Sequence, residues 1–473
     1  MSRWKNLKGV VGRSMNGLIY SNNWTIIISL ITSTLLVQCT ELNPPPPFEG
    51  VAAGPPPVTA AYSEWQYQDT SLQVGRLEDK ILGLLVGSAI GDALGAPTEM
   101  WGRWQISEEY GFVDSLDLVL REPSPEGPWG RNLPAGAGTD DTRWKALLTN
   151  FFVEQSKVPS SGPPLPGTSA FAEYVTAAYV QELEALKAIE SLEPEPYTEQ
   201  IQRFVWLQEW ARITRAYSSG DIDAYRNSLS RFYGGEMACA GMLYAPMIGA
   251  FYPGRPEIAY TQMYELALFD LGYARDISGL TAALTALAFR DSLTTDSLKY
   301  QLITVDPAEY FDSRLLSRVA FQQFQQAERI VRNARKIDST VLAEQNIAIP
   351  PDYPYDSLHY LQTQDIYRQL NLLEQDVPFH AGEIHLINLT ALLFSELDFQ
   401  RALEFIVNYG RDNDTVAAVT GAILGAYHGA AALPAEMKEL VIRVNREELG
   451  IDLVDLAAEL TQAILNRRKT MLN

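Results

Sequence analysis

The chain has 473 residues, of which 47% are hydrophobic, which is enough to bury one large core or two ordinary ones. Its formal net charge of −21 argues against binding nucleic acid through the phosphate backbone, so we expect no nucleic-acid partner. Two cysteines exclude a disulfide framework, and four scattered histidines do not favour a histidine-based metal site.

Residues 1–39 have the pattern of a targeting segment. Basic residues precede an apolar run, Trp24–Val37, that is too short to span a bilayer comfortably. The run leads into Leu36-Val37-Gln38-Cys39, which resembles a bacterial lipobox with Gln38 in the place of a small residue. We therefore expect an exported protein, at the periplasmic face or cell surface. A lipid on Cys39 would hold it to the membrane, and an uncleaved N-terminal anchor is the alternative.

Residues 40–62 follow as a linker, because the proline clusters Pro44–Pro47 and Pro55–Pro57 favour an extended, semi-rigid chain. Residues 63–473 form the globular body, and their apolar periodicity is helical almost throughout, with few strand signals. The pattern predicts an all-α domain with a long loop at Trp101–Pro134 and helices over Arg76–Ala93, Arg143–Gln155, Phe171–Glu190, Glu199–Tyr217, Glu257–Arg290, Ser313–Lys336, Asp365–Glu374, Ala381–Asn408 and Glu436–Asn466.

Two helices carry glycine at every fourth position, which places the glycines on one face of each helix. Glycine costs about 1 kcal/mol relative to alanine inside a helix, so a stripe of this kind needs a packing reason. We expect the two faces to pack against each other, with Asp92 as a buried structural group between the glycines. The stripes are Gly83, Gly87, Gly91 and Gly95 in one helix and Gly421, Gly425 and Gly429 in the other.

Two acidic turns each open a helix: Thr139-Asp140-Asp141-Thr142 and Asp412-Asn413-Asp414-Thr415. Either turn alone is typical of a helix N-cap. Two matched turns beside glycine-striped helices indicate one composite site, where crowded carboxylates would repel unless a metal neutralised them. Their oxygen ligands select Mg²⁺, Mn²⁺ or Ca²⁺ over Zn²⁺. Cys239 has no histidine nearby in sequence, and we interpret it as a buried small hydrophobe.

Four blocks resemble, in this order, the signature blocks of the ADP-ribosylglycohydrolases, including the dinitrogenase reductase-activating glycohydrolases. They span about Asp79–Ala432 and read GLLVGSAIGDALGAPTE, GTDDT, GGEMACAGMLYAP and GRDNDTVAAVTGAILGAYHG. The resemblance implies a single large helical domain with a binuclear Mg²⁺ or Mn²⁺ centre in an ADP-ribose cleft. The polar stretch 291–376 has no counterpart in the family pattern, and we interpret it as an insertion.

By motif position, the resemblance assigns metal binding to Thr139, Asp140, Asp141, Asp412, Asp414 and Thr415. It places Glu99 beside the metals and the substrate, with Glu99, Asp141 and Asp414 as candidate catalytic residues. Further substrate contacts fall on Gly138, Gly234 and Gly235. The sequence departs from the family at Arg411, where glycine is usual, and at Glu236, where the family contacts phosphate.

The function expected from these residues is metal-dependent hydrolysis of the ribosyl bond in an ADP-ribosylated or related nucleotide-sugar adduct. The partners are then a small-molecule or protein-linked substrate and the membrane, and we expect a monomer. One alternative is a binding module that keeps the cleft and metals without turnover. A purely structural use of the fold is disfavoured, because it would not require so many crowded carboxylates.

Overall fold

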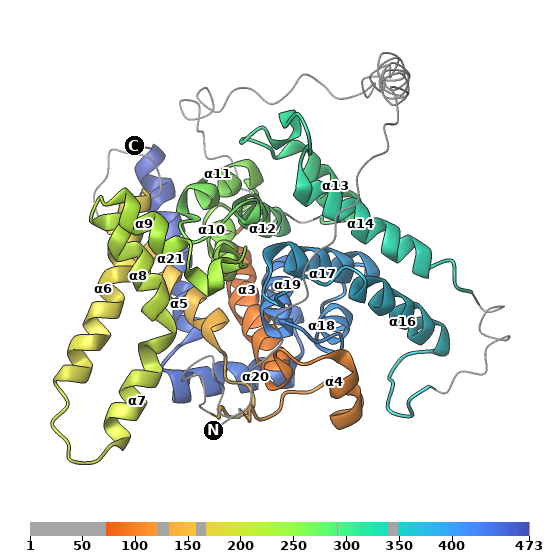
Figure 1. Cartoon of the computed structure of the whole chain (residues 1–473), viewed down its shortest axis with the longest axis horizontal. Helices are drawn as coiled ribbons and strands as arrows, with labels where there is room; N and C mark the ends of the chain where they lie inside the picture. Colours follow the sequence, from red (N-terminus) through yellow and green to blue (C-terminus); the bar gives the residue numbers. More distant parts are fainter. Residues whose placement is uncertain (1–71, 121–131, 158–166, 291, 339–348, 473) are drawn as a thin grey trace, which may run out of the picture. The chain divides into compact units, whose positions relative to one another are not determined.

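The computed structural model describes residues 72–120, 132–157, 167–290, 292–338 and 349–472. The predicted targeting segment, Cys39 and the linker 40–62 lie outside the described residues. Within the described ranges the body is all-α, as predicted, and residues outside the helices contribute only isolated β-bridges. Figure 1 shows the arrangement of the helices.

The helices follow one another along the described chain. Their bounds are α3 (Val74–Gly95), α4 (Arg103–Glu109), α5 (Asp140–Ser156), α6 (Thr168–Lys187), α7 (Glu195–Phe204), α8 (Gln208–Ser218), α9 (Ile222–Leu229), α10 (Ala245–Phe251), α11 (Pro256–Leu266), α12 (Ala274–Ala288), α13 (Thr295–Thr304), α14 (Val319–Ala334), α16 (Ser357–Asn371), α17 (Ala381–Phe394), α18 (Phe399–Val407), α19 (Asn413–His428), α20 (Ala435–Val444) and α21 (Leu453–Leu472).

Helices α3 and α19 form the most extensive helix pair of the described body and lie side by side in Figure 1. Their glycine faces meet, as predicted: a β-carbon on Gly87 would run into the carbonyl oxygen of Gly421, and one on Gly425 into that of Gly83. This close backbone approach explains the glycine stripes. By length and composition α3 could cross a membrane, but 89% of its apolar window is buried inside the fold, so it is a core helix.

The predicted helix Glu199–Tyr217 is divided between α7 and α8 by a 3₁₀ turn, Val205–Leu207, and two longer predicted helices are interrupted by loops. Glu257–Arg290 is divided between α11 and α12, with Gly272 in a left-handed conformation (φ 54°) just before α12. Ala381–Asn408 is divided between α17 and α18, where Glu396 and Leu397 have φ values of 55° and 68°. The left-handed Glu396 and Leu397 follow the end of α17, whereas α11 ends at Leu266, where Ala267 leaves the helical region (φ −77°, ψ 61°). The apolar period continues through both breaks because the helices on either side face the same core.

Two other segments differ from the prediction in smaller ways. Trp101–Pro134, predicted as a loop, contains the short helix α4, which buries Ile106. Glu436–Asn466 is divided between α20 and α21 by a π-helical turn, Asn445–Leu449, that ends at the left-handed Gly450. The side chain of Asn445 is buried there and binds the loop that precedes α5.

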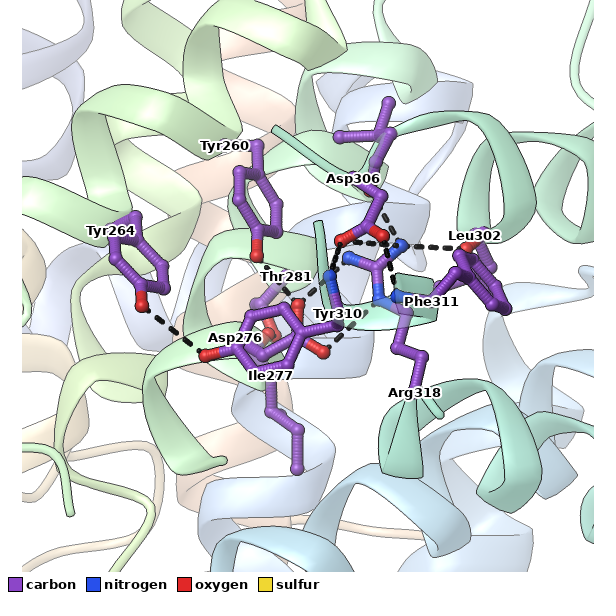
Figure 2. Close-up of polar contacts among 11 residues, drawn as sticks. Tyr260, Tyr264, Asp276, Ile277, Thr281, Leu302, Asp306, Tyr310, Phe311 and Arg318 are labelled. Atoms are coloured by element: carbon purple, nitrogen blue, oxygen red, sulfur yellow. Dashed lines mark hydrogen bonds and ion pairs between the residues drawn. The ribbon is translucent and has the colours of Figure 1, made fainter. Parts of the chain in front are cut away.

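The polar stretch 291–376, interpreted from the sequence as an insertion, contributes α13, α14 and α16. It is attached to the core by Arg318, whose side chain is fully buried and pairs with Asp276 of α12 at 2.7 Å (Figure 2). The guanidinium also donates to the carbonyls of Leu302 and Val305, at 2.9 and 2.6 Å, and Tyr260 donates its hydroxyl to Asp276 at 2.6 Å. This network anchors the start of α14.

Candidate metal centre

Asp92 of α3 organises the first acidic turn from within the core. Its carboxylate accepts hydrogen bonds from the backbone N–H and hydroxyl of Thr139, at 2.9 and 2.8 Å. It also accepts from the N–H and hydroxyl of Thr142, at 3.0 and 2.5 Å. Burial raises the pKa of Asp92 to about 6, and the nearby charge of Asp141 adds to this effect. Asp92 is therefore the structural residue that the sequence predicted, and it holds the N-terminus of α5 against α3.

The second acidic turn is joined by its backbone to the loop that follows Glu99. The N–H of Met100 donates to the carbonyl of Arg411 at 2.7 Å, and the N–H of Arg411 donates to the carbonyl of Trp101 at 2.8 Å. These two bonds place Glu99 beside Asp412, in the position that the family resemblance implies.

Arg411 has a backbone conformation that glycine would adopt without strain. Its φ is 68°, in the left-handed region, and this explains why the family usually has glycine there. Here the guanidinium donates to both carboxylate oxygens of Glu383, at 2.6 and 2.9 Å. The ion pair holds the turn in this conformation from the outside of the cluster.

Three carboxylates converge into a set that could hold a metal ion. One oxygen from each of Glu99, Asp412 and Asp414 lies within 4.8 Å of the others. Asp414 is 2% exposed, and its Oδ1 has no hydrogen-bond partner in the protein. A buried, unpartnered carboxylate oxygen is strongly unfavourable. The residues present therefore fit a hard divalent cation, which prefers oxygen ligands of this kind.

The electrostatics of the cluster lead to the same conclusion. Burial, followed by the charge of Glu99, raises the pKa of Asp412 to about 7. The same causes, in the same order, raise the pKa of Asp414 well above its usual value. Without a cation these shifts favour the protonated carboxyl groups, and a bound cation would replace those protons.

The other predicted metal residues occupy different positions. Asp140 and Thr415 line the same cleft as the three carboxylates. Asp141 is buried behind them: its Oδ1 lies 2.6 Å from Lys145 Nζ, and its Oδ2 accepts from the Thr415 hydroxyl at 2.9 Å. The Thr139 hydroxyl donates to Asp92, as described above. The structure thus brings all six residues into one region but places only some of them on the cleft.

The cleft has a volume of about 460 Å³, with a carboxylate side and an aromatic side. On the aromatic side, the ring centroid of Tyr233 lies 6.3 Å from that of Trp210 and 5.4 Å from that of Phe379. Cys239 also lines the cleft, and its Sγ is 3.8 Å from Asp412 Oδ2. Burial and then the charge of Asp412 raise the pKa of the thiol well above its usual value, so it stays protonated.

The glycines assigned to substrate contact lie away from the cleft wall. Gly138 is buried, its N–H donates to Asn445 at 3.0 Å, and a β-carbon there would collide with Thr142. Gly234 and Gly235 are exposed and do not line the cleft, although their neighbour Tyr233 does.

Several residues of the site were not identified from the sequence. Lys145 stands four residues after Asp141, a spacing that favours ion pairs on a helix, so this signal was available. The aromatic side chains of Trp210, Tyr233 and Phe379 come from separate segments, and no motif connects them. Cys239 was correctly interpreted as buried, but its place beside Asp412 depends on the fold.

Comparisons with known proteins place this chain in a family. Uncharacterized protein YegU of Escherichia coli (strain K12) is 31% identical over 77 residues, 16% of this chain and 22% of YegU, so the match spans less than a quarter of that relative. A solved chain titled "ADP-ribosylglycohydrolase-related protein complex" is 17% identical with a TM-score of 0.47, covering 82% of this chain and 99% of its own. The family model described as ADP-ribosylglycohydrolase matches residues 74–469, nearly all of the described body and both acidic turns. The chain therefore belongs to the ADP-ribosylglycohydrolase family.

Proposed function

We propose that the protein is a divalent-cation-dependent hydrolase that cleaves the ribosyl bond of an ADP-ribosylated or related nucleotide-sugar adduct. The observation that carries the proposal is the unpartnered Oδ1 of Asp414, which is buried beside Glu99 and Asp412 on a cleft. Mg²⁺ or Mn²⁺ suits this oxygen-only set. When bound, such a cation polarises the oxygens that it contacts and stabilises negative charge on them.

The protein's own side chains stabilise charge and exchange protons during the reaction. Cleavage at the anomeric carbon of a ribosyl group passes through an oxocarbenium-like transition state. The carboxylates around the cleft stabilise the positive charge that develops on the sugar. Glu99 is more exposed than Asp412 or Asp414, so it is the group that can exchange a proton with the leaving group or with water.

The aromatic side of the cleft accounts for the planar part of the substrate. Tyr233 is 38% exposed, and its ring is a neighbour of both the Trp210 and the Phe379 ring. Stacking of a base on such rings contributes roughly 1–3 kcal/mol. A substrate with its ribose at the carboxylates and its base at Tyr233 occupies both sides of the cleft.

The charge of the cleft wall favours some substrates over others. None of the described residues that line it is lysine, arginine or histidine. An anionic leaving group would therefore be repelled by the carboxylates. Among ADP-ribose adducts, those with a cationic or neutral leaving group, such as arginine-linked or serine-linked ADP-ribose, fit this wall best.

A substrate panel tests the proposal. We expect the purified protein with Mg²⁺ or Mn²⁺ to release a ribosyl-containing fragment from at least one of arginine-linked, serine-linked and O-acetyl-linked ADP-ribose or a simple nucleoside. The D414N variant should lose this turnover. Tight binding of ADP-ribose with no turnover of any panel member would show that the protein is a binding module and not an enzyme. Absence of both binding and turnover would overturn the assignment.

A further inference from the structure

Lys145 is a buried cation beside Asp141, one of the carboxylates of the candidate metal centre. It lies one helical turn after Asp141 on α5, and the side chains of Lys145 and Asp141 are 2% and 1% exposed. The ammonium nitrogen is 2.6 Å from Asp141 Oδ1. A buried ammonium is unfavourable unless a carboxylate pairs with it, so this pair is a fixed part of the cluster and not a surface contact.

Both oxygens of Asp141 already have a partner inside the protein. Its Oδ1 binds Lys145, and its Oδ2 accepts the hydroxyl of Thr415 at 2.9 Å. An ion bound to Asp141 would have to displace a buried ammonium or lie close beside it. The ion and the Lys145 ammonium, both bound to one carboxylate in a buried site, would repel each other strongly.

The carboxylates that could bind an added cation are Glu99, Asp412 and Asp414. Among the described residues, Glu99, Asp412 and Asp414 form the single set of three metal-ligating side chains whose atoms converge within 4.8 Å. Asp414 Oδ1 is the buried oxygen that lacks a partner, whereas both oxygens of Asp141 have one. The Lys145 ammonium thus neutralises Asp141, whereas the unpartnered carboxylate oxygen beside it, which an external cation would satisfy, belongs to Asp414.

We propose that this centre takes one divalent cation, at Glu99, Asp412 and Asp414, and that the Lys145 ammonium supplies the second positive charge in place of a second ion. The inference rests on the proposed cation dependence. It differs from the expectation of a binuclear centre that the family resemblance implies. Lys145 is then a positioning residue, because it acts through Asp141 and Thr415 and does not contact the substrate.

The number of bound ions tests the proposal without reference to activity. We would measure Mn²⁺ by equilibrium dialysis and elemental analysis on the full chain and on the K145M and K80M variants. Lys80 is the matched control, since it is also buried, and its Nζ donates to the carbonyls of Ala288 and Ala426, both at 3.0 Å. We expect one ion in the wild type, one in K80M and two in K145M, where Asp141 is left without its cation.

A second variant covers the case in which K145M does not fold. D141N/K145M removes both charges of the pair together, so neither partner is left unpaired, and we expect it to keep one ion. Two ions in the wild type, one ion in folded K145M, or loss of the ion from folded D141N/K145M would each overturn the inference while leaving cation dependence intact. No Mn²⁺ bound to the wild type would overturn the proposed function as well.

Discussion

Gly95 lies directly against Asp414: a β-carbon on Gly95 would come within 2.5 Å of the Asp414 backbone nitrogen and Cα. Gly95 is the last glycine of the stripe on α3, and Asp414 belongs to the first turn of α19. The close packing of these two helices therefore sets the position of a carboxylate in the cluster. Stability of the core and geometry of the site depend on the same contact.

The first prediction follows from this contact. G95A should destabilise the protein by about 1–3 kcal/mol, because the added methyl group has no space. It should also reduce the increase in melting temperature that Mn²⁺ produces, because Asp414 is displaced. G75A is the control, since nothing lies within 4 Å of a β-carbon at Gly75 in the same helix. Thermal unfolding with and without Mn²⁺ measures both effects, and an undiminished Mn²⁺ response in G95A would contradict the coupling.

The second prediction concerns the pH dependence of stability without a cation. Burial raises the pKa of Asp92 to about 6 and that of Asp412 to about 7, from the usual 3.8. Between pH values of about 4 and 7 the folded state therefore binds more protons than the unfolded state. The free energy of unfolding should then fall as the pH rises through this window.

The same linkage predicts the opposite trend for binding of a cation. Protons compete with the cation for the carboxylates, so the stabilisation by Mn²⁺ should grow as the pH rises. Melting temperatures at about pH 5 and 7.5, in EDTA and in Mn²⁺, check both trends. A cation-free protein whose melting temperature rises across this window would show that these carboxyl groups are not protonated in the fold.

The third prediction separates proton transfer from cation binding. E99Q keeps the size of the side chain and one ligand oxygen, so we expect substrate affinity to change little while turnover falls by roughly 10²–10⁴. D412N should instead reduce the Mn²⁺-induced rise in melting temperature. Glu257, an exposed residue in the first turn of α11, provides the control variant E257Q, which should behave as the wild type. Steady-state kinetics on the reactive member of the panel measure these effects. Normal turnover in E99Q would exclude a proton-transfer function for Glu99.

The fourth prediction concerns the ion pair of Arg318 and Asp276 that Figure 2 shows. Both side chains are fully buried. R318M leaves the Asp276 carboxylate buried and unpaired, which we expect to destabilise the protein by about 3–5 kcal/mol. R212Q removes an exposed pair, Arg212 with Glu209, and should change stability by less than about 0.5 kcal/mol. Chemical denaturation measures the difference, and equal effects of the two substitutions would contradict the anchoring function of Arg318.

The fifth prediction concerns the N-terminal sequence. We propose that Cys39 carries a lipid that holds the body to a membrane outside the cytoplasm. Fractionation should find the wild-type chain with membranes and the C39S chain released or mislocalised. Mass spectrometry of the N-terminus distinguishes a lipidated Cys39 from an uncleaved anchor, and a full-length chain free in the cytoplasm would exclude both.

Local patterns in the sequence were enough to predict the all-α fold, the contact between the glycine stripes and the two acidic turns. Each of these depends on residues a few positions apart. A repeat of four places Gly83 and Gly87 on one face of a helix, and carboxylates such as Asp140 and Asp412 favour the start of a helix. Packing of the two stripes brings the second turn against Gly95 at the end of α3, and the hydrogen bonds of Asp92 hold the first turn at the same end.

Only the tertiary structure decided which oxygens are available at the site. Glu99 reaches Asp412 because the backbone of Met100 pairs with that of Arg411, a contact between segments distant in sequence. The spacing of Asp141 and Lys145 allows an ion pair, but an exposed pair at that spacing contributes little. Burial of both side chains makes the pair of Asp141 and Lys145 a permanent part of the site. Periodicity indicates which face of a helix is buried, whereas the partner of each buried polar atom is decided by how distant helices pack.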